Sequence, residues 1–522
     1  MTPRRREALG LAAAAIAGYV RSFDVPFIWD DLPHIANNAQ IRAPLGSGAW
    51  LHAGTQETRP LLNLSFAVNH AIFGLAPAGW HATNVLLHVL AVWALSAALR
   101  ALFRRRPGAP LDPDADAFAP RAAAAGALLF AVHPLATEAV TYINSRSVVA
   151  ATAAMAAAFW ALERRRAAGT AATVWQRALP GALLAFGLLW KEMAVTLPAL
   201  VLVVDALLPP RDTSGTTLPW RTRLRGPLAL LPALLVLPIL FAFFRSPHTQ
   251  HIGFSVAEPI RSAATQPIAL ARLAALALLP VGQNLDHDLP LVPSPLAPES
   301  VLALVGWALA VVSVWRVRHR SPLPLLGVLA FLLVMAPTNS VVPFYDAMCE
   351  RHLYPGLAVV CAGGGAVLAR LADPPGSHRR AMGATAALTL VLLTLTLLRN
   401  ELWRDPRALW RDAAAGSPHK ARPAAQLGAH LARDGDLDQA RPLLERAVAL
   451  APEVRPFREN LGLLYRLQGR PEAELALWQA RVDAAPDDAV AARILARLRR
   501  RAGVPPPLEG HTGARRLRER GQ

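Results

Sequence analysis

Residues 80–106 of the chain read WHATNVLLHVLAVWALSAALRALFRRR. The stretch from Trp80 to Phe103 is apolar over at least the roughly 20 residues that a helix needs to cross a bilayer, and three arginines follow it directly. Comparable apolar stretches recur from Leu9 to Leu398, in a chain of 522 residues that is 53% hydrophobic with a mean hydropathy of +0.30. The sequence therefore predicts a polytopic, all-α membrane protein with a soluble part after about residue 400.

The distribution of charge along the chain is also that of a membrane protein. Its net charge of +18 would suggest nucleic-acid binding in a soluble domain. Here the arginines cluster at the ends of the apolar stretches, as the positive-inside rule requires, so we expect no nucleic-acid partner. Only two basic residues are lysines, Lys191 and Lys420. Because arginine supplies nearly all other positive charges, the lysine at position 191 in the membrane region indicates a task that arginine does not perform. Cys349 and Cys361 are too few for a disulfide framework.

The basic loops predict a topology of eleven spans. Arg4 to Arg6 place the N-terminus in the cytoplasm, with the first span as an uncleaved signal anchor. The expected spans are 9–20, 80–103, 121–136, 147–163, 178–190, 193–209, 226–244, 299–315, 322–336, 354–371 and 380–398. Residues 262–281 are expected to form an interfacial or re-entrant helix, because the segment is amphipathic and a span there would invert the positive-inside rule. Abundant Ala, Pro and Arg indicate a GC-rich bacterial genome. We therefore expect the inner membrane, with the C-terminal part in the periplasm.

The C-terminal part repeats with a period of 34 residues from Ala425 onward. The repeated pairs are Leu427-Gly428 with Leu461-Gly462, Gly435 with Gly469, and Pro452 with Pro486. Small residues at close helix contacts and a proline after each second helix are typical of tetratricopeptide repeats. We predict a transmembrane domain over 1–400, a tetratricopeptide domain over 401–504 and a disordered basic tail over 505–522. Asn460, on the inner helix of the second repeat, is either a peptide-binding residue or a solvated one.

Unusual polar residues collect in the loops expected outside, which favours an active site over scattered ion pairs. They are Asp30, Asp31, Arg59, His133 with Glu138, Lys191, Glu192, Asp286 to Asp288, Glu350, Arg351 and Tyr354. Transfer from a lipid-linked sugar phosphate needs a carboxylate that deprotonates the acceptor hydroxyl and cations that stabilise the leaving phosphate. Asp30 or Asp31 suits the first task, because adjacent like charges raise one pKa. The cations that suit the second are Lys191, Arg351, Arg59 and Arg146.

The sequence leaves a structural explanation open for each of these groups. The aspartate pair could cap a helix, Lys191 and Glu192 could neutralise each other at a hairpin tip, and Glu350 could pair with Arg351. The acids Asp286 and Asp288 are expected to be ordinary loop residues. No metal or cofactor is expected, because the histidines show no HExxH-type spacing. These histidines are His70, His81, His88 and His133.

The order of short motifs along the chain resembles one family. The motifs are Trp29-Asp30-Asp31, Arg59-Pro60-Leu61, Trp80 to His88, Ala131 to Pro134 with Thr137-Glu138, Lys191-Glu192, and Glu350-Arg351 with Leu353-Tyr354. Together with the repeats they resemble the transmembrane and tetratricopeptide-repeat O-mannosyltransferases, which are C-type polytopic glycosyltransferases. The resemblance implies inverting transfer of a sugar from a polyprenyl phosphate to a hydroxyl outside the cytoplasm. It also implies Asp30 as the base with Asp31 in support, Glu138 as the second acid, and phosphate contacts from Lys191 and Arg351.

These expectations combine into one prediction and its rivals. The prediction is a glycosyltransferase that uses a polyprenyl-phosphate sugar, mannose by default, and modifies periplasmic proteins, with the repeats as the expected guide for the acceptor. With about two and a half repeats, an envelope glycan or a lipid is the alternative acceptor. A non-catalytic repeat scaffold is a further alternative. A transporter is disfavoured, because the ionisable residues are expected at one membrane surface and not near the bilayer midplane.

Overall fold

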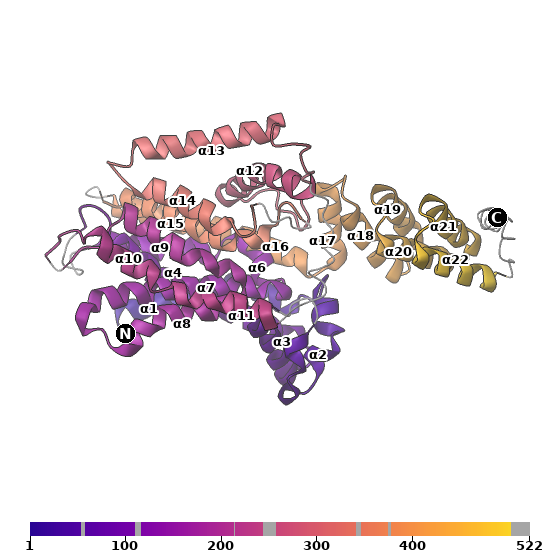
Figure 1. Cartoon of the computed structure of the whole chain (residues 1–522), viewed down its shortest axis with the longest axis horizontal. Coiled ribbons are helices and arrows are strands. Elements are labelled where there is room, and N and C mark those ends of the chain that lie inside the picture. Colours follow the sequence, from indigo (N-terminus) through magenta and orange to yellow (C-terminus); the bar gives the residue numbers. More distant parts are fainter. Residues whose placement is uncertain are drawn as a thin grey trace, which may run out of the picture. The chain divides into compact units, whose positions relative to one another are not determined.

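The computed structural model of the chain describes residues 1–53, 58–109, 116–212, 214–243, 257–340, 346–373 and 377–502. Within these ranges every regular element is a helix, apart from one isolated bridge between Arg211 and Thr217. The all-α class predicted from the sequence is confirmed. The chain divides into two compact units, Met1–Leu409 and Trp410–Gln522 (Figure 1). The predicted tail 505–522 lies outside the described residues.

The first unit contains the apolar helices. They are α1 (Pro3–Gly18), α2 (Ala39–Arg42), α3 (Pro60–Phe73), α4 (Pro77–Phe103), α5 (Phe118–Ala131), α6 (Thr137–Val140), α7 (Arg146–Ala168), α8 (Val174–Trp190), α9 (Leu197–Leu207), α10 (Trp220–Leu228), α11 (Val236–Phe243), α12 (Ala257–Leu278), α13 (Pro298–Arg316), α14 (Leu323–Met335), α15 (Tyr354–Leu371) and α16 (His378–Trp403). Helix α17 (Pro406–Gly416) crosses the division between the units. The loop expected between the first two spans thus contains two helices, α2 and α3.

Six helical segments in the described ranges are long and apolar enough to cross a bilayer. They are Pro77–Phe103, Ile143–Ala171, Trp220–Leu240, Pro298–Arg316, Glu350–Leu371 and His378–Trp403. The pair Phe118–Ala131 and Pro134–Val140, bent by 57°, makes a seventh if it is one span. Several of the other predicted spans coincide with shorter helices, such as α9 with 11 residues and α14 with 13. The chain is a multi-pass membrane protein, and the count of eleven spans stays a prediction.

Small residues bring two helices at the centre of the first unit into backbone contact. Helix α5 packs along α15, with Gly126 facing Gly365. A Cβ atom at Gly365 would collide with the backbone of Ala122 and of Gly126. One at Gly126 would lie 3.0 Å from the carbonyl oxygen of Cys361. Close approach through small residues is a usual way for membrane helices to associate. This contact fixes α5 and α15, whose ends lead into the polar segments described below.

The second unit is a row of helices at the predicted spacing. They are α18 (Ala421–Arg433), α19 (Leu437–Leu450), α20 (Arg455–Leu467), α21 (Pro471–Ala484) and α22 (Ala489–Arg501). Helices α18, α20 and α22 begin at residues 421, 455 and 489, which are 34 residues apart. Gly428 lies against Leu444 of the next helix, and Gly462 occupies the corresponding place against Trp478. The helices therefore repeat with the same 34-residue period as the sequence. The assignment to tetratricopeptide repeats stays a prediction.

Candidate active site

The loop with the aspartate pair is built on an unusual backbone conformation. Trp29 has a φ of 50°, and it is the one non-glycine residue with a positive φ in the described part of the chain. Such a conformation costs roughly 1 kcal/mol or more for a residue with a side chain, and it is found most often at functional sites. The indole stacks on Tyr142, with ring centroids 5.7 Å apart and an angle of 11° between the planes. This stacking holds the turn that presents Asp30 and Asp31.

The two aspartates occupy different environments. Asp31 is buried, and its carboxylate accepts hydrogen bonds from the backbone N–H groups of Ile28 at 3.3 Å and Asn144 at 2.9 Å. Burial raises its pKa well above the usual range, and the Asp30 charge adds to this effect. Asp30 is only half-buried, and its backbone N–H donates to the Tyr142 hydroxyl at 3.2 Å. The Asp31 side chain makes no capping hydrogen bond to the helical turn that follows it, Leu32–Ala36.

Glu138 and Arg351 form a buried ion pair that joins two distant segments. The Arg351 guanidinium donates to Oε1 of Glu138 at 2.7 Å, and the backbone N–H of Arg351 donates to Oε2 of Glu138 at 3.0 Å. The guanidinium also lies 5.3 Å from the Trp29 ring centroid. Arg351 therefore connects α6 to the loop with the aspartates. Both oxygens of Glu138 are engaged, so this acid holds Arg351 in position.

Glu350 has different partners from its neighbour, so the alternative in which Glu350 pairs with Arg351 is wrong. Its carboxylate accepts hydrogen bonds from the backbone N–H of Asn284 at 2.7 Å and from two side chains. These are Nε2 of His287 at 2.7 Å and Nε2 of Gln283 at 3.2 Å. Glu350 thus anchors the segment around residues 283–287. The sequence singled out His287 but missed Gln283 and Asn284, which carry no motif.

Lys191 is a buried cation that does not form an ion pair with its sequence neighbour Glu192. Glu192 instead pairs with Arg59, with contacts of 3.0 and 3.3 Å. The Lys191 ammonium is 5% exposed and forms no hydrogen bond or ion pair with any described residue. Burial and the Arg59 charge lower the pKa of Lys191 from 10.5 to about 7, and Arg351 adds a smaller effect in the same direction. The Glu192 charge opposes this effect, but its ion pair is with Arg59, so Lys191 and Glu192 do not form an ion pair of their own.

Two further residues of the predicted site, Arg146 and Tyr354, lie in the core. Arg146 is fully buried at the start of α7, where it donates to Oδ1 of Asn84 at 2.6 Å, to Ser65 and to the carbonyl oxygen of Trp80 at 3.1 Å. Tyr354 is also fully buried, and its hydroxyl bonds Nδ1 of His88 at 2.7 Å. The polar groups of both residues already have partners inside the helix bundle, which suits a structural role, and a phosphate contact for either one stays a prediction.

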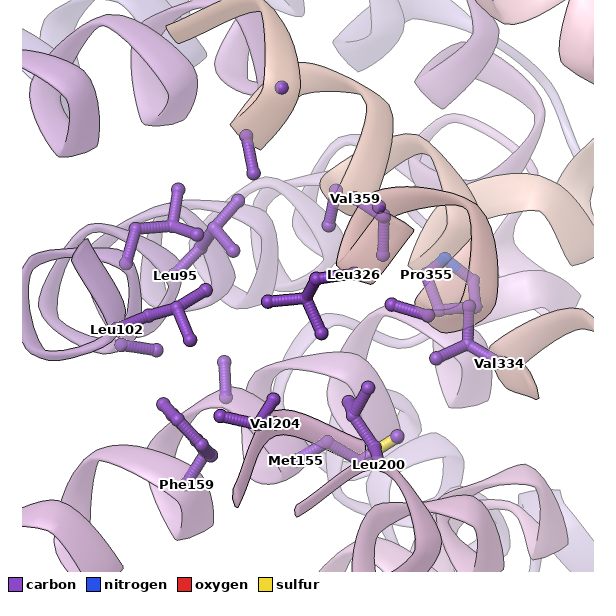
Figure 2. Close-up of a pocket in the computed structure, with 18 of the residues that line it drawn as sticks. Leu95, Leu102, Met155, Phe159, Leu200, Val204, Leu326, Val334, Pro355 and Val359 are labelled. Carbon is purple, nitrogen blue, oxygen red and sulfur yellow. The ribbon is translucent and has the colours of Figure 1, made fainter. Parts of the chain in front are cut away.

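An apolar groove is lined by helices that begin a few residues after the cations. It is formed by α4, α7, α9, α14 and α15 (Figure 2). Pro355 and Leu197 line the groove, four residues after Arg351 and six residues after Lys191, respectively. Leu102 and Val204 line it farther along α4 and α9. The groove therefore runs along the helices from the end that holds the cations.

Buried charged residues also lie at the other end of the bundle, where the sequence predicted basic loops. Asp205 lies in an apolar helix and is buried between two arginines, Arg105 at 2.7 Å and Arg166 at 2.5 Å. Glu163 pairs with Arg166 at 2.7 Å. These residues lie at the opposite end of α7 from Arg146, roughly 25 Å away at 1.5 Å per residue. Buried ion pairs therefore occur at both ends of the first unit.

The remaining predicted residue, Asn460, lies on α20 of the second unit and is half-buried. Among the described residues, no group of three or more His, Cys, Asp or Glu side chains is arranged to hold a metal ion.

Comparison with known proteins gives sequence relatives for part of the chain. Human protein O-mannosyl-transferase TMTC4 is 36% identical over 155 residues, which is 27% of this chain and 20% of that protein. Mouse TMTC2 is 32% identical over 210 residues, or 37% of this chain and 23% of that protein. Drosophila melanogaster Tmtc1 is 30% identical over 212 residues, or 38% and 23%. The chain thus matches about a fifth of the length of these curated relatives.

Two further comparisons were made. The chain matches no protein-family model. Among solved structures, ArnT from Cupriavidus metallidurans bound to undecaprenyl phosphate aligns with a TM-score of 0.44 at 17% identity, over 92% of this chain and 80% of that one. The resemblance read from the motifs is confirmed at the level of sequence: this chain is similar to the protein O-mannosyl-transferases of the transmembrane and tetratricopeptide-repeat group.

Proposed function

We propose that the chain is a membrane glycosyltransferase that takes a sugar from a polyprenyl-phosphate carrier. The observation that carries the proposal is a buried, unpaired lysine at the end of an apolar groove. A buried charge without a partner is costly, and an anion bound beside it offsets that cost. An apolar chain suits the groove, and its terminal phosphate would lie against Lys191 and Arg351. A polyprenyl phosphate combines these two features in one molecule.

The environments of the aspartates support a division of labour between them. Asp31 fixes the loop through its two backbone hydrogen bonds, whereas Asp30 is accessible. In the proposed reaction Asp30 takes the proton of the acceptor hydroxyl, and the hydroxyl oxygen forms a bond to the anomeric carbon of the sugar. The bond between that carbon and the phosphate oxygen breaks, and the carrier leaves as polyprenyl phosphate. The attack comes from the face opposite the leaving group, so the configuration inverts.

The cations would stabilise the charge that develops on the leaving phosphate. Lys191 supplies a charge without an internal partner, and Arg351 supplies a second one, held in place by Glu138. Arg59 is bound to Glu192 and would reinforce the positive potential. In this proposal Glu138 and Glu192 are positioning residues.

The acceptor and the location are the finer part of the proposal. By analogy with the names of its relatives, we propose mannose as the sugar and protein hydroxyls as the acceptors. We further propose that the site and the repeat unit face the periplasm of a bacterial inner membrane. There the repeats, with Asn460 on an inner helix, would present extended peptide segments.

The test compares the full-length chain with two variants in nanodiscs, supplied with radiolabelled polyprenyl phosphate mannose and periplasmic protein extract. Asp30→Asn should lower label transfer by about 100-fold or more, the usual contribution of a general base, while carrier binding stays unchanged. Asp24→Asn is the matched control, because its side chain is 63% exposed in the same loop. It should transfer label as the wild type does.

Three results would change the proposal. Label that appears in lipid or glycan and not in protein would overturn the protein acceptor and keep the donor. Equal transfer by the wild type and Asp30→Asn would exclude Asp30 as the base. Failure of the wild type to bind the carrier would reject the glycosyltransferase and favour a scaffold.

A further inference from the structure

A basic hollow lies at the end of the helix bundle opposite the candidate active site. Its volume is about 1360 Å³, and α1, α4, α7 and the segment after α9 contribute to it. The charged residues that line it are Arg4, Arg100, Arg104, Arg105, Arg164 and Arg211, with Glu163 as the single acid. Clustering of arginines at span ends is expected for any membrane protein. What the sequence does not show is that six arginines from distant segments share one hollow.

The positive charge of the hollow is only partly neutralised. Glu7 binds Arg100 at 2.6 Å, and Asp205 binds Arg105 at 2.7 Å. Arg4, Arg164 and Arg211 are exposed and form no ion pair with any residue that the structure describes. Three cations therefore remain for an anion from outside the chain.

An exposed apolar surface leads into the hollow. Leu86, Leu90 and Trp93 of α4 are 57%, 42% and 39% exposed. The same helix face continues to Ala97 and Ala101, which line the hollow, because residues three and four apart lie one above the other. Trp160 also lines the hollow, and the Arg164 guanidinium lies 5.7 Å from its ring centroid. Tryptophan beside arginine at this depth is typical of the headgroup level of a bilayer.

We propose that the basic hollow binds the headgroup of an anionic phospholipid whose acyl chains lie along the exposed face of α4. The phosphate would contact Arg4, Arg164 and Arg211, and the chains would cover Leu86, Leu90 and Trp93. Basic pockets between membrane helices bind anionic lipid headgroups in this way. The apolar face distinguishes a phospholipid from a free phosphate, which would gain nothing from it. This inference does not depend on the proposed glycosyltransferase reaction.

Native mass spectrometry of the full-length chain tests the proposal. The probes are dioleoyl phosphatidylglycerol, dioleoyl phosphatidylcholine and inorganic phosphate. The site variant replaces Arg4, Arg164 and Arg211 by glutamine, and the matched control replaces Arg316, Arg379 and Arg380, which are equally exposed and lie outside the hollow. We expect the site variant to bind phosphatidylglycerol about tenfold more weakly, since each basic residue near a membrane surface contributes to anionic lipid binding. The control should bind as the wild type does.

Each other outcome overturns a part of the proposal. Equal weakening in the control would show a general surface-charge effect without a site. Equal binding of phosphatidylcholine would exclude recognition of the anionic headgroup. Competition by inorganic phosphate at the same concentration as the lipid would show an anion site without a role for the acyl chains. Thermal unfolding of both variants, measured in parallel, checks that they are folded.

Discussion

Replacing Lys191 with methionine should make the protein more stable while weakening its hold on the carrier. The pKa of Lys191 falls from 10.5 in its ordinary state to about 7 in the fold. A tenfold change in an acid dissociation constant corresponds to about 1.4 kcal/mol, so the buried ammonium destabilises the folded state by at most about 4 kcal/mol at pH 7. Methionine has a similar length and no charge, so we expect a gain in unfolding free energy of about 2 kcal/mol.

The dependence of stability on pH follows from the direction of this pKa shift. Because the folded pKa lies below the unfolded one, the unfolded chain binds more protons between pH 7 and pH 10.5, and the stability of the wild type rises across that window. The destabilisation by Lys191 is complete below pH 7. The stability difference between Lys191→Met and the wild type should therefore be largest near pH 6.5 and should shrink by pH 9.5.

Thermal unfolding of the full chain in nanodiscs, followed by tryptophan fluorescence, measures this difference. Adding polyprenyl phosphate should raise the Tm of the wild type more than that of Lys191→Met, because only the wild type has the buried cation. The matched control is Lys420→Met, the other lysine of the chain, in the second unit. A Lys191→Met protein that is less stable than the wild type at pH 6.5 would refute the reasoning, since the ammonium would then have an internal partner.

Three more substitutions separate structural residues from the candidate site. Arg146→Met should lower the unfolding free energy by about 3 to 5 kcal/mol, because it leaves buried acceptors on Asn84, Ser65 and Trp80 unpaired, while the exposed Arg42→Met should not. A Tm equal to that of the wild type would show that Arg146 is dispensable to the core. Tyr354→Phe removes the hydrogen bond to His88, which should lower the unfolding free energy by about 1 kcal/mol and leave sugar transfer unchanged. A large loss of transfer with a normal Tm would instead indicate that Tyr354 belongs to the active site. Gly365→Ala should destabilise the protein by about 1 to 3 kcal/mol or more through collision with α5, whereas a Cβ at Gly363 meets nothing within 4 Å. Equal yields and Tm values for these two alanine variants would contradict the backbone contact.

Hydropathy predicted the helices of the first unit well. The expected span 80–103 is part of α4, and the expected span 380–398 is part of α16. Hydropathy did not predict α3, an apolar helix of 14 residues in the first long loop. The motifs also singled out Asp30, Glu138, Lys191 and Arg351. In the structure these four residues lie on segments around one end of the bundle. Their catalytic and binding roles stay predictions.

The choice of partners could not be predicted, because adjacency in sequence does not give side-chain direction. Glu350 and Arg351 are neighbours in a short turn, yet they bind His287 and Glu138 respectively. Asp205 interrupts an apolar stretch, and an acid there requires a buried basic partner. Polar Asn84 on an apolar helix likewise pointed to a buried donor, which is Arg146.

The contact of Gly126 with Gly365 has a mechanical consequence. Helix α5 leads through one bent turn to Glu138, and α15 begins just after Arg351. With their backbones in contact, the two helices tilt as one piece, so the ion pair and the α15 wall of the groove keep a fixed geometry. Any widening that admits the isoprenoid of the proposed carrier must then come from α4, α7, α9 or α14, the walls outside this pair. Mutations on those helices should therefore alter the rate of carrier entry without altering the chemistry that follows.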